Sequence, residues 1–591
     1  MRALGKFLLG TLAVVGFLFL ALVGLAWWGF SSLDIEDMMA ERAERPDQMV
    51  LTLDLRRPFP EGDDAGPLSL LPEAAPLPLS ATVRAIDAAA KDPDVRGILA
   101  EVGGTQAGIA QVQELRDAVK RFRQSGKPAI VFAETMNEGN DSLDAYLSSS
   151  FDEVWLQPSG GVGPLGFAAE VPFLHNLLQE MGVEPQFAAR ENHKSAVDSF
   201  TRDSMSPYQR ESLEEMLGGF WSQFVMDVSA DRNLSADAVR QMASRSPLLS
   251  GEALESGLVD RLGYRHEVES EVRKRANTQG MLPFESYAHG ILEDEATAAP
   301  RLALIQASGP ISRGSPESGP FGGGGIYSDV LSDAIHEAME DGSIEAIVLR
   351  IDSPGGSYVA SDTVWNTLRQ AREKGMPVVV SMGNVAASGG YFIAMAGDHI
   401  VAERGTVTGS IGVISGKFVL SDLWRNLDVT WNDVSVGGGQ SLMYSPNQSF
   451  TDEQWVRFEQ HLDWIYNDFV SKVADARGMS KQQVRVVAGG RIWTGEAALK
   501  NGLVDSLGGM NEAVAEAKIL AGISGDTPVT LVPFPKPSSG LDRVLATLGG
   551  APLIGADSEA IAALGRLVKV LDPVTRRVEA MEQGPLRAPL H

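Results

Sequence analysis

Residues 376–396 read MPVVVSMGNVAASGGYFIAMA, and the fold is decided by this stretch. Residues 376–380 are apolar and β-branched, which predicts a buried strand, and residues 392–396 predict a buried helix. Between them, Ser388 lies in a turn of small residues. Such a turn exposes a hydroxyl, and the N-terminus of the next helix offers N–H groups and partial positive charge to an oxyanion. The stretch alone fits either a nucleophilic serine or an ordinary Ser/Gly turn.

The chain contains an internal duplication around this stretch. Each copy reads strand, helix, strand, helix, strand with short turns, which predicts right-handed βαβ units. We therefore expect the α/β class, as tandem duplicated domains with mainly parallel sheets. Four blocks carry the match, at offsets of 249, 249, 246 and 245 residues: 95–99 with 344–348, 125–131 with 374–380, 162–166 with 408–412, and 254–260 with 499–505.

The two copies differ where chemistry is expected. At an offset of 249, Ser388 corresponds to Gly139, and at an offset of 246, Lys194 corresponds to Gln440. One copy keeps a serine and the other a lysine. A serine needs a base to become a nucleophile, and a lysine can serve if burial lowers its pKa from about 10.4 to roughly 7–8. Taken by itself, Lys194 would be interpreted as a solvated loop lysine.

Four motifs make a more specific pattern, together with the tandem halves and an apolar N-terminal segment: RIDSPGG at 350–356, ASGGY at 387–391, TGSIG at 408–412 and KSA at 194–196. From about residue 45 to 530 the chain resembles the signal peptide peptidase A (SppA) family, membrane-anchored Ser-Lys peptidases of the Clp/crotonase fold. The resemblance implies that Ser388 is the nucleophile and Lys194 the general base. It also implies a homotetramer.

Further residues are candidates for supporting roles. A hydroxyl at Ser410 would orient the Lys194 amine towards Ser388, although a helix N-cap or turn serine is the alternative. Gly355 and Gly356 let a backbone N–H approach a ligand, and with the N–H of Ser388 or Gly389 they are candidates for an oxyanion hole. Gly355 is the first choice, and a tight turn is the alternative.

The N-terminus predicts a membrane anchor. Residues 7–30 are almost wholly apolar and uncharged, long enough to span a bilayer core of about 30 Å. A cleaved signal peptide, the alternative, has an apolar region of only about 7–15 residues. Arg2 and Lys6 precede the segment and acidic residues follow, so the N-terminus should be cytoplasmic. Together with the resemblance, which implies a bacterial inner-membrane protein, this predicts a single-pass protein with its catalytic part in the periplasm.

The composition argues against two classes of function, nucleic-acid binding and metal or cofactor chemistry. There are 77 acidic and 50 basic residues, a net charge of −27, and no basic stripe that would suit nucleic acid. The chain has no cysteine, and its eight histidines form no metal-binding motif, so we expect no cofactor and no metal. The expected division is a membrane anchor (1–31), a first repeat carrying the lysine (45–264), a linker (265–300), a second repeat carrying the serine (301–525) and a C-terminal tail (526–591).

The expected function is hydrolysis of peptides, in particular cleaved signal peptides, by a membrane-anchored serine endopeptidase that works through an acyl-enzyme. Neither repeat holds both members of the dyad, so the site should form where the copies meet, within one chain. Two alternatives stay open. One is a crotonase-like acyl-CoA enzyme, which would not need both Ser388 and Lys194. The other is a non-catalytic anchored scaffold, since the first copy has lost its serine.

Overall fold

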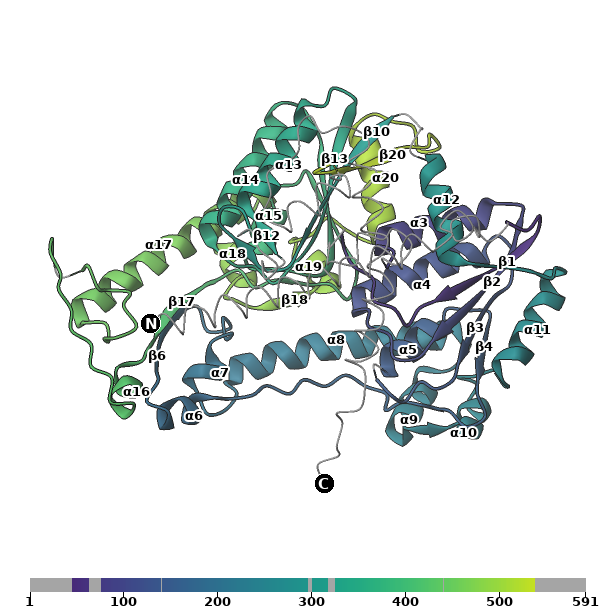
Figure 1. The fold of residues 1–591 in the computed structure, drawn as a ribbon, viewed down its shortest axis with the longest axis horizontal. Coiled ribbons are helices and arrows are strands. Elements are labelled where there is room, and N and C mark those ends of the chain that lie inside the picture. The colour runs from purple at the N-terminus through teal and green to yellow at the C-terminus, as the bar shows by residue number, and fades with distance from the viewer. Residues whose placement is uncertain are drawn as a thin grey trace, which may run out of the picture.

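The computed structural model describes residues 45–62, 76–139, 141–295, 300–316, 325–438 and 440–536. They form two α/β bodies side by side, the first repeat in purple to teal and the second in green to yellow (Figure 1). The predicted α/β class with parallel sheets is confirmed. The expected anchor lies outside the described residues. Within the described ranges no helix has the length and apolar character needed to cross a bilayer.

The first repeat is built on a six-stranded parallel sheet. Its strands are almost continuously buried, as expected where helices cover both faces of a parallel sheet. Helices α3 (Leu79–Lys91), α4 (Ile109–Arg123) and α5 (Asp141–Ser148) cover one face, and α11 (Arg265–Ala276) covers the other. The strand order is β8 (Arg261–Leu262), β4 (Glu153–Leu156), β3 (Ala129–Ala133), β2 (Val95–Val102), β1 (Met49–Asp54) and β9 (Gly280–Pro283).

The second repeat has the same plan on an eight-stranded sheet. Helices α13 (Ser328–Glu340) and α14 (Tyr358–Glu373) pack on one face and α20 (Met510–Leu520) on the other. The order is β18 (Ile492–Thr494), β16 (Val407–Gly409), β14 (Val378–Ala387), β13 (Ile344–Ser353), β10 (Arg301–Ser308) and β20 (Thr530–Phe534), with β15 (His399–Ala402) and β19 (Ser506–Leu507) joined through β14. Only β18 runs antiparallel, against β16.

The remaining elements are short or lie outside the two sheets. The helices are α6 (His175–Glu180), α7 (Asp198–Thr201), α8 (Pro207–Asp231), α9 (Ala236–Arg245), α10 (Ser250–Glu255), α12 (Phe284–Glu295), α15 (Gly389–Ala394), α16 (Ser421–Asn426), α17 (Asp452–Arg477), α18 (Lys481–Val487) and α19 (Gly495–Lys500). The strands are β5 (Gly161–Val162), β6 (Glu184–Arg190), β7 (Leu248–Leu249), β11 (Ile311–Ser312), β12 (Ile326–Tyr327) and β17 (Val413–Val419).

Three boundaries differ from the sequence-based expectation. The strand expected over 376–380 continues to Ala387, directly before the serine turn. Residues 265–300, expected as a linker, instead form α11, β9 and α12, and β9 pairs with β1 of the first sheet. Beyond the expected boundary at 525, β20 pairs with β10. In both sheets the late strand covers an edge that would otherwise expose unpaired backbone groups.

The repeats interlock at several places, among them a strand pair and a buried group of ion pairs. Strand β6 of the first repeat pairs antiparallel with β17 of the second, from Val413 opposite Arg190 to Val419 opposite Glu184. In Figure 1 this ladder projects at the left, far from the first sheet. Deeper inside, Arg350 on β13 is buried against two first-repeat carboxylates, those of Glu61 and Glu114. The first repeat is thereby held across the carboxyl end of the second sheet.

Candidate active site

Ser388 is the single residue between β14 and α15, and its backbone is strained. Its backbone has φ 53° and ψ −116°, a conformation that L-residues rarely adopt. The turn is held because the Ser388 N–H donates to the Gly409 carbonyl (2.9 Å) and the Phe392 N–H donates to the Ser388 carbonyl (2.9 Å). A Cβ placed on Gly355 would lie 2.8 Å from the Ser388 Cβ, so a glycine is required there.

Lys194 reaches this turn from the other repeat. It follows β6, whose pairing with β17 carries the first-repeat chain across to the second sheet. The Lys194 Nζ lies 3.0 Å from Ser388 Oγ, 2.9 Å from Ser410 Oγ and 2.8 Å from the Ser410 carbonyl oxygen. One chain thus brings together Ser388 and Lys194, which the comparison of the two copies singled out, and Ser410, the supporting candidate from the TGSIG motif.

The surroundings of Lys194 favour a neutral amine. The residue is 8% exposed, and in the described part of the chain no carboxylate forms an ion pair with it. Burial lowers the pKa of Lys194 to about 8, because the charged form loses its hydration. A neutral amine has two N–H bonds and one lone pair. The two Ser410 oxygens take the N–H bonds, which leaves the lone pair for the Ser388 hydroxyl.

A glycine turn that sequence reasoning missed holds the Lys194 backbone. The His193 N–H donates to the Gly489 carbonyl (3.1 Å). Gly490 has φ 79°, and a Cβ on it would lie 2.5 Å from the Lys194 nitrogen and 2.6 Å from its Cβ. On the other side of the side chain, a Cβ on Gly412 would lie 3.2 Å from the Lys194 Cδ. Lys194 therefore fits only between residues without side chains.

The same turn is tied to Ser410 and to the first repeat. The Gly490 N–H donates to the Ile411 carbonyl (2.9 Å), and the Ser410 N–H donates to the Arg491 carbonyl (2.8 Å). The Arg491 guanidinium forms ion pairs with two carboxylates of α8, those of Glu211 (3.0 Å) and Glu215. One loop thus sets the positions of both the lysine and the serine that contacts it. The Gly489-Gly490 dipeptide was its only signal in the sequence.

Two of the candidate oxyanion donors are engaged elsewhere. The Gly355 N–H donates to Ser353 Oγ (3.2 Å), and the Ser388 N–H donates to Gly409. Gly355, the first choice from sequence, is therefore not directed at a ligand.

Gly356 and Gly389 remain as candidate donors. The Ile311 N–H donates to the Gly355 carbonyl, and the Ser357 N–H donates to the Ile311 carbonyl. The Gly356 N–H lies between these two groups on the strand and therefore points away from Ile311. A Cβ on Gly389 would lie 3.1 Å from the Gly356 nitrogen. Both backbones thus meet beside Ser388. Among the described residues, no cluster of three or more His, Asp or Glu side chains is suited to hold a metal ion.

Comparison with known proteins gives matches in both repeats. The model of Peptidase family S49 matches residues 121–279 and 370–524, and a Clp protease model matches residues 327–405. Protease 4 of Salmonella typhi is 32% identical, covering 84% of this chain and 82% of the relative. The chloroplastic serine protease SPPA of Arabidopsis thaliana is 31% identical, covering 84% and 72%. A putative signal peptide peptidase SppA of Enterococcus faecium is 33% identical, covering 31% and 53%.

Proposed function

The chain belongs to peptidase family S49 and is a serine peptidase, and from this premise we propose that Ser388 is its nucleophile and Lys194 its general base. The observation that carries the proposal is the 3.0 Å contact between Lys194 Nζ and Ser388 Oγ at a buried site. No histidine is needed, because burial already brings the pKa of Lys194 to about 8.

The chemistry follows the general course of acyl transfer. Neutral Lys194 takes the proton of Ser388 Oγ as that oxygen bonds to the peptide carbonyl carbon. The Gly356 and Gly389 N–H groups donate to the carbonyl oxygen as it becomes an oxyanion. The Lys194 ammonium then protonates the departing amine, leaving an acyl-enzyme on Ser388. Water attacks the ester, Lys194 takes its proton and returns it to Ser388 Oγ, and the acid product leaves.

The substrates we propose are peptides, in particular signal peptides released in the membrane. One relative is named for signal peptides. Residues 7–30 would anchor the enzyme in the bacterial inner membrane, with residues 1–6 in the cytoplasm and both repeats in the periplasm. The test is digestion of a synthetic signal peptide and of casein by the purified protein, with Ser388→Ala as control. Turnover of an acyl-CoA thioester that survives in Ser388→Ala would instead support a crotonase-like enzyme.

The dyad predicts that activity rises with pH. Only neutral Lys194 accepts a proton, and burial lowers its pKa to about 8. We expect kcat to increase through about pH 8 and to level off above it, well below the usual lysine value of about 10.4. The measurement is a kcat–pH profile between pH 6 and 10. An activity that falls above pH 6 would contradict a lysine base.

The glycine turn predicts a contrast between two neighbouring substitutions. Gly490→Ala should lower kcat and leave KM little changed, because its Cβ would overlap the Lys194 backbone at 2.5 Å. Gly489→Ala is the matched control. It has a similar φ of 68°, but its Cβ would meet nothing closer than 3.9 Å. Both variants carry the same kind of backbone strain. Equal losses of kcat in the two variants would show that the turn does not position Lys194.

We further propose that the protein works as a homotetramer, as the resemblance to the SppA family implies.

A further inference from the structure

A groove runs along one face of α17 in the second repeat. Its volume is about 550 Å³, and two of its aromatic side chains are largely exposed, Trp464 at 59% and Tyr444 at 61%. The four lining residues from α17 stand at positions i, i+3, i+4 and i+7, so they share one face of the helix. We call this the α17 groove; it is lined by Met443 and Tyr444 from the preceding loop and by Arg457, Gln460, His461 and Trp464 from α17.

One wall of the α17 groove is held in place by a buried lysine. Lys417 on β17 is 9% exposed. Its Nζ donates to three carbonyl oxygens of the loop, those of Met443 (2.8 Å), Ser445 (2.9 Å) and Gln448 (2.7 Å). The ammonium also lies 4.1 Å from the centre of the Phe450 ring, a cation–π contact. The groove is therefore formed before any ligand arrives, as ligand sites usually are.

Packed aromatic rings connect the α17 groove with the active site. Trp464 lies edge-to-face with Tyr358, at 5.9 Å between ring centres, and Tyr358 lies edge-to-face with Phe392 at 5.7 Å. Tyr358 follows the candidate oxyanion donor Gly356 by two residues. Phe392 belongs to α15, the helix that begins directly after Ser388. The groove thus adjoins the surface on which a bound peptide would continue past Ser388.

Arg457 brings a positive charge into the α17 groove. Within the ranges that the structure describes, no carboxylate forms an ion pair with it, and its guanidinium donates to the side-chain oxygen of Gln460 (3.2 Å). Two carboxylates of α17, those of Glu459 and Asp463, pair instead with Arg190 on β6. A guanidinium so placed, in a chain of net charge −27, is suited to a carboxylate of the ligand, which it can bind through two parallel hydrogen bonds.

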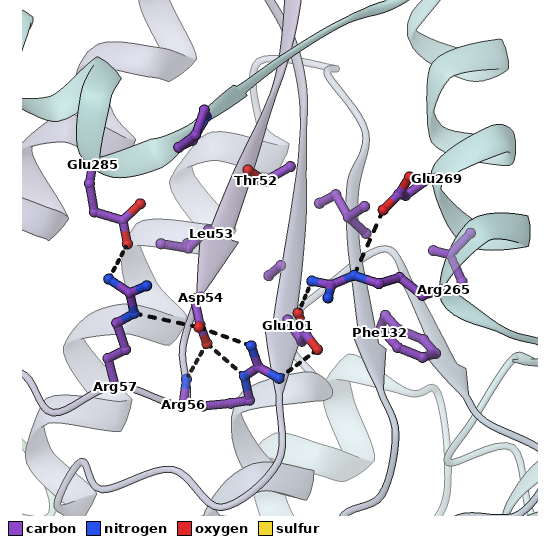
Figure 2. A pocket seen from close by; sticks show the side chains of 14 residues that line it. Thr52, Leu53, Asp54, Arg56, Arg57, Glu101, Phe132, Arg265, Glu269 and Glu285 are labelled. Carbon is purple, nitrogen blue, oxygen red and sulfur yellow. Dashed lines mark hydrogen bonds and ion pairs between the residues drawn. The ribbon is translucent and has the colours of Figure 1, made fainter. Parts of the chain in front are cut away.

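Figure 2 shows the contrasting case, a charged cavity of about 190 Å³ at the carboxyl end of the first sheet, where the chain's own carboxylates neutralise the guanidinium groups. Arg56 pairs with Asp54 (2.8 Å) and with one oxygen of Glu101 (2.7 Å). Arg265 pairs with the other oxygen of Glu101. Arg57 pairs with Asp54 (3.5 Å). An anionic ligand would have to displace these carboxylates, so this cavity is poorly suited to bind one.

We propose that the α17 groove binds the end of a peptide substrate, with the free C-terminal carboxylate on Arg457 and apolar side chains against Tyr444 and Trp464. His461, whose ring stacks on Trp464 at 5.9 Å, adds a second N–H donor one helical turn from Arg457. This site deepens the peptidase function proposed above and rests on it. A signal peptide that has been cut from its precursor carries a carboxylate at the cut end, whereas the uncut precursor has a peptide bond there. The groove would thus favour released peptides over intact precursors.

Two synthetic signal peptides that differ only at the C-terminus, a free acid and an amide, test the proposal with the purified full-length protein. The acid should be hydrolysed with a kcat/KM about fivefold higher, mostly through KM, which is the size expected of one solvent-accessible ion pair. In Arg457→Gln the acid should fall to the level of the amide. Arg240→Gln is the matched control, because it removes the same charge from an exposed helix face of the first repeat and should keep the preference. Tyr444→Ala should raise KM for both peptides alike, because the apolar contact does not depend on the end group.

Equal kcat/KM for acid and amide in the wild type, or a preference that persists in Arg457→Gln, would overturn the carboxylate site and leave the peptidase standing. Equal rates on the two peptides, together with inhibition by glycerol 3-phosphate of the wild type but not of Arg457→Gln, would assign the groove to a phospholipid headgroup instead. Hydrolysis of neither peptide nor casein by the wild type would overturn the proposed function itself.

Discussion

Replacing Lys194 with alanine is expected to lower kcat for peptide hydrolysis by about 10²–10⁴-fold, the usual contribution of a general base. The reason is geometric: Lys194 Nζ is the group placed 3.0 Å from Ser388 Oγ, and Ser410 holds it there. The fold should persist, because Lys194 forms no ion pair in the described structure and its removal leaves no buried charge. The measurement is kcat with a fluorogenic peptide, alongside a thermal melt.

Two controls separate the base from the bulk of the side chain. Lys194→Arg keeps a long cationic side chain, but a guanidinium cannot give up its proton in a protein, so it should be as inactive as Lys194→Ala. Ser410→Ala removes one of the two acceptors and should cost about tenfold or less, the effect of a single hydrogen bond. Near-normal turnover in Lys194→Ala would show that another group activates Ser388.

Replacing Arg350 with methionine is expected to destabilise the protein by about 3–5 kcal/mol. The Arg350 guanidinium is 1% exposed and pairs with Glu61 (2.7 Å) and Glu114 (2.5 Å), both from the first repeat. Burial alone would lower the pKa of Arg350, but the two carboxylates raise it, so the group stays charged. Its loss would leave two buried carboxylates without a cation where the repeats meet. Urea unfolding of wild type and variant measures the difference.

Arg369→Met is the matched control for this prediction. Arg369 lies on α14 and pairs with Glu373, but both side chains are exposed, so its loss should cost about 1 kcal/mol or less. Adding Glu61→Gln and Glu114→Gln to Arg350→Met should recover part of the stability, because the buried charges then disappear together. Equal unfolding midpoints for Arg350→Met and Arg369→Met would mean that the buried pair does not hold the repeats together.

The duplication made the principal residues of the site predictable. Ser388 and Lys194 stand out because each is missing from the other copy, at Gly139 and Gln440. The alternation of strand and helix patterns within each copy also predicted parallel sheets. Those patterns could be predicted because local hydrophobicity determines them.

The residues that support the site could not be predicted, because their contacts are distant in sequence. Gly490 meets Lys194, almost 300 residues earlier, and Arg350 meets Glu61 across the repeat boundary. Gly355 was the wrong first choice between two adjacent glycines, since only the structure shows that its N–H bonds to Ser353. Residues 265–300 looked like a linker because nothing local reveals that β9 joins the first sheet edge.

The most direct test of a Ser388–Lys194 dyad is to label the protein with a fluorophosphonate and locate the adduct by mass spectrometry of its peptides. The dyad predicts one adduct, on Ser388, formed faster as the pH rises through about 8, the pKa to which burial lowers Lys194. It also predicts that Lys194→Ala slows the labelling by orders of magnitude. An adduct on another residue, or labelling of Ser388 at the same rate in Lys194→Ala, would contradict the dyad.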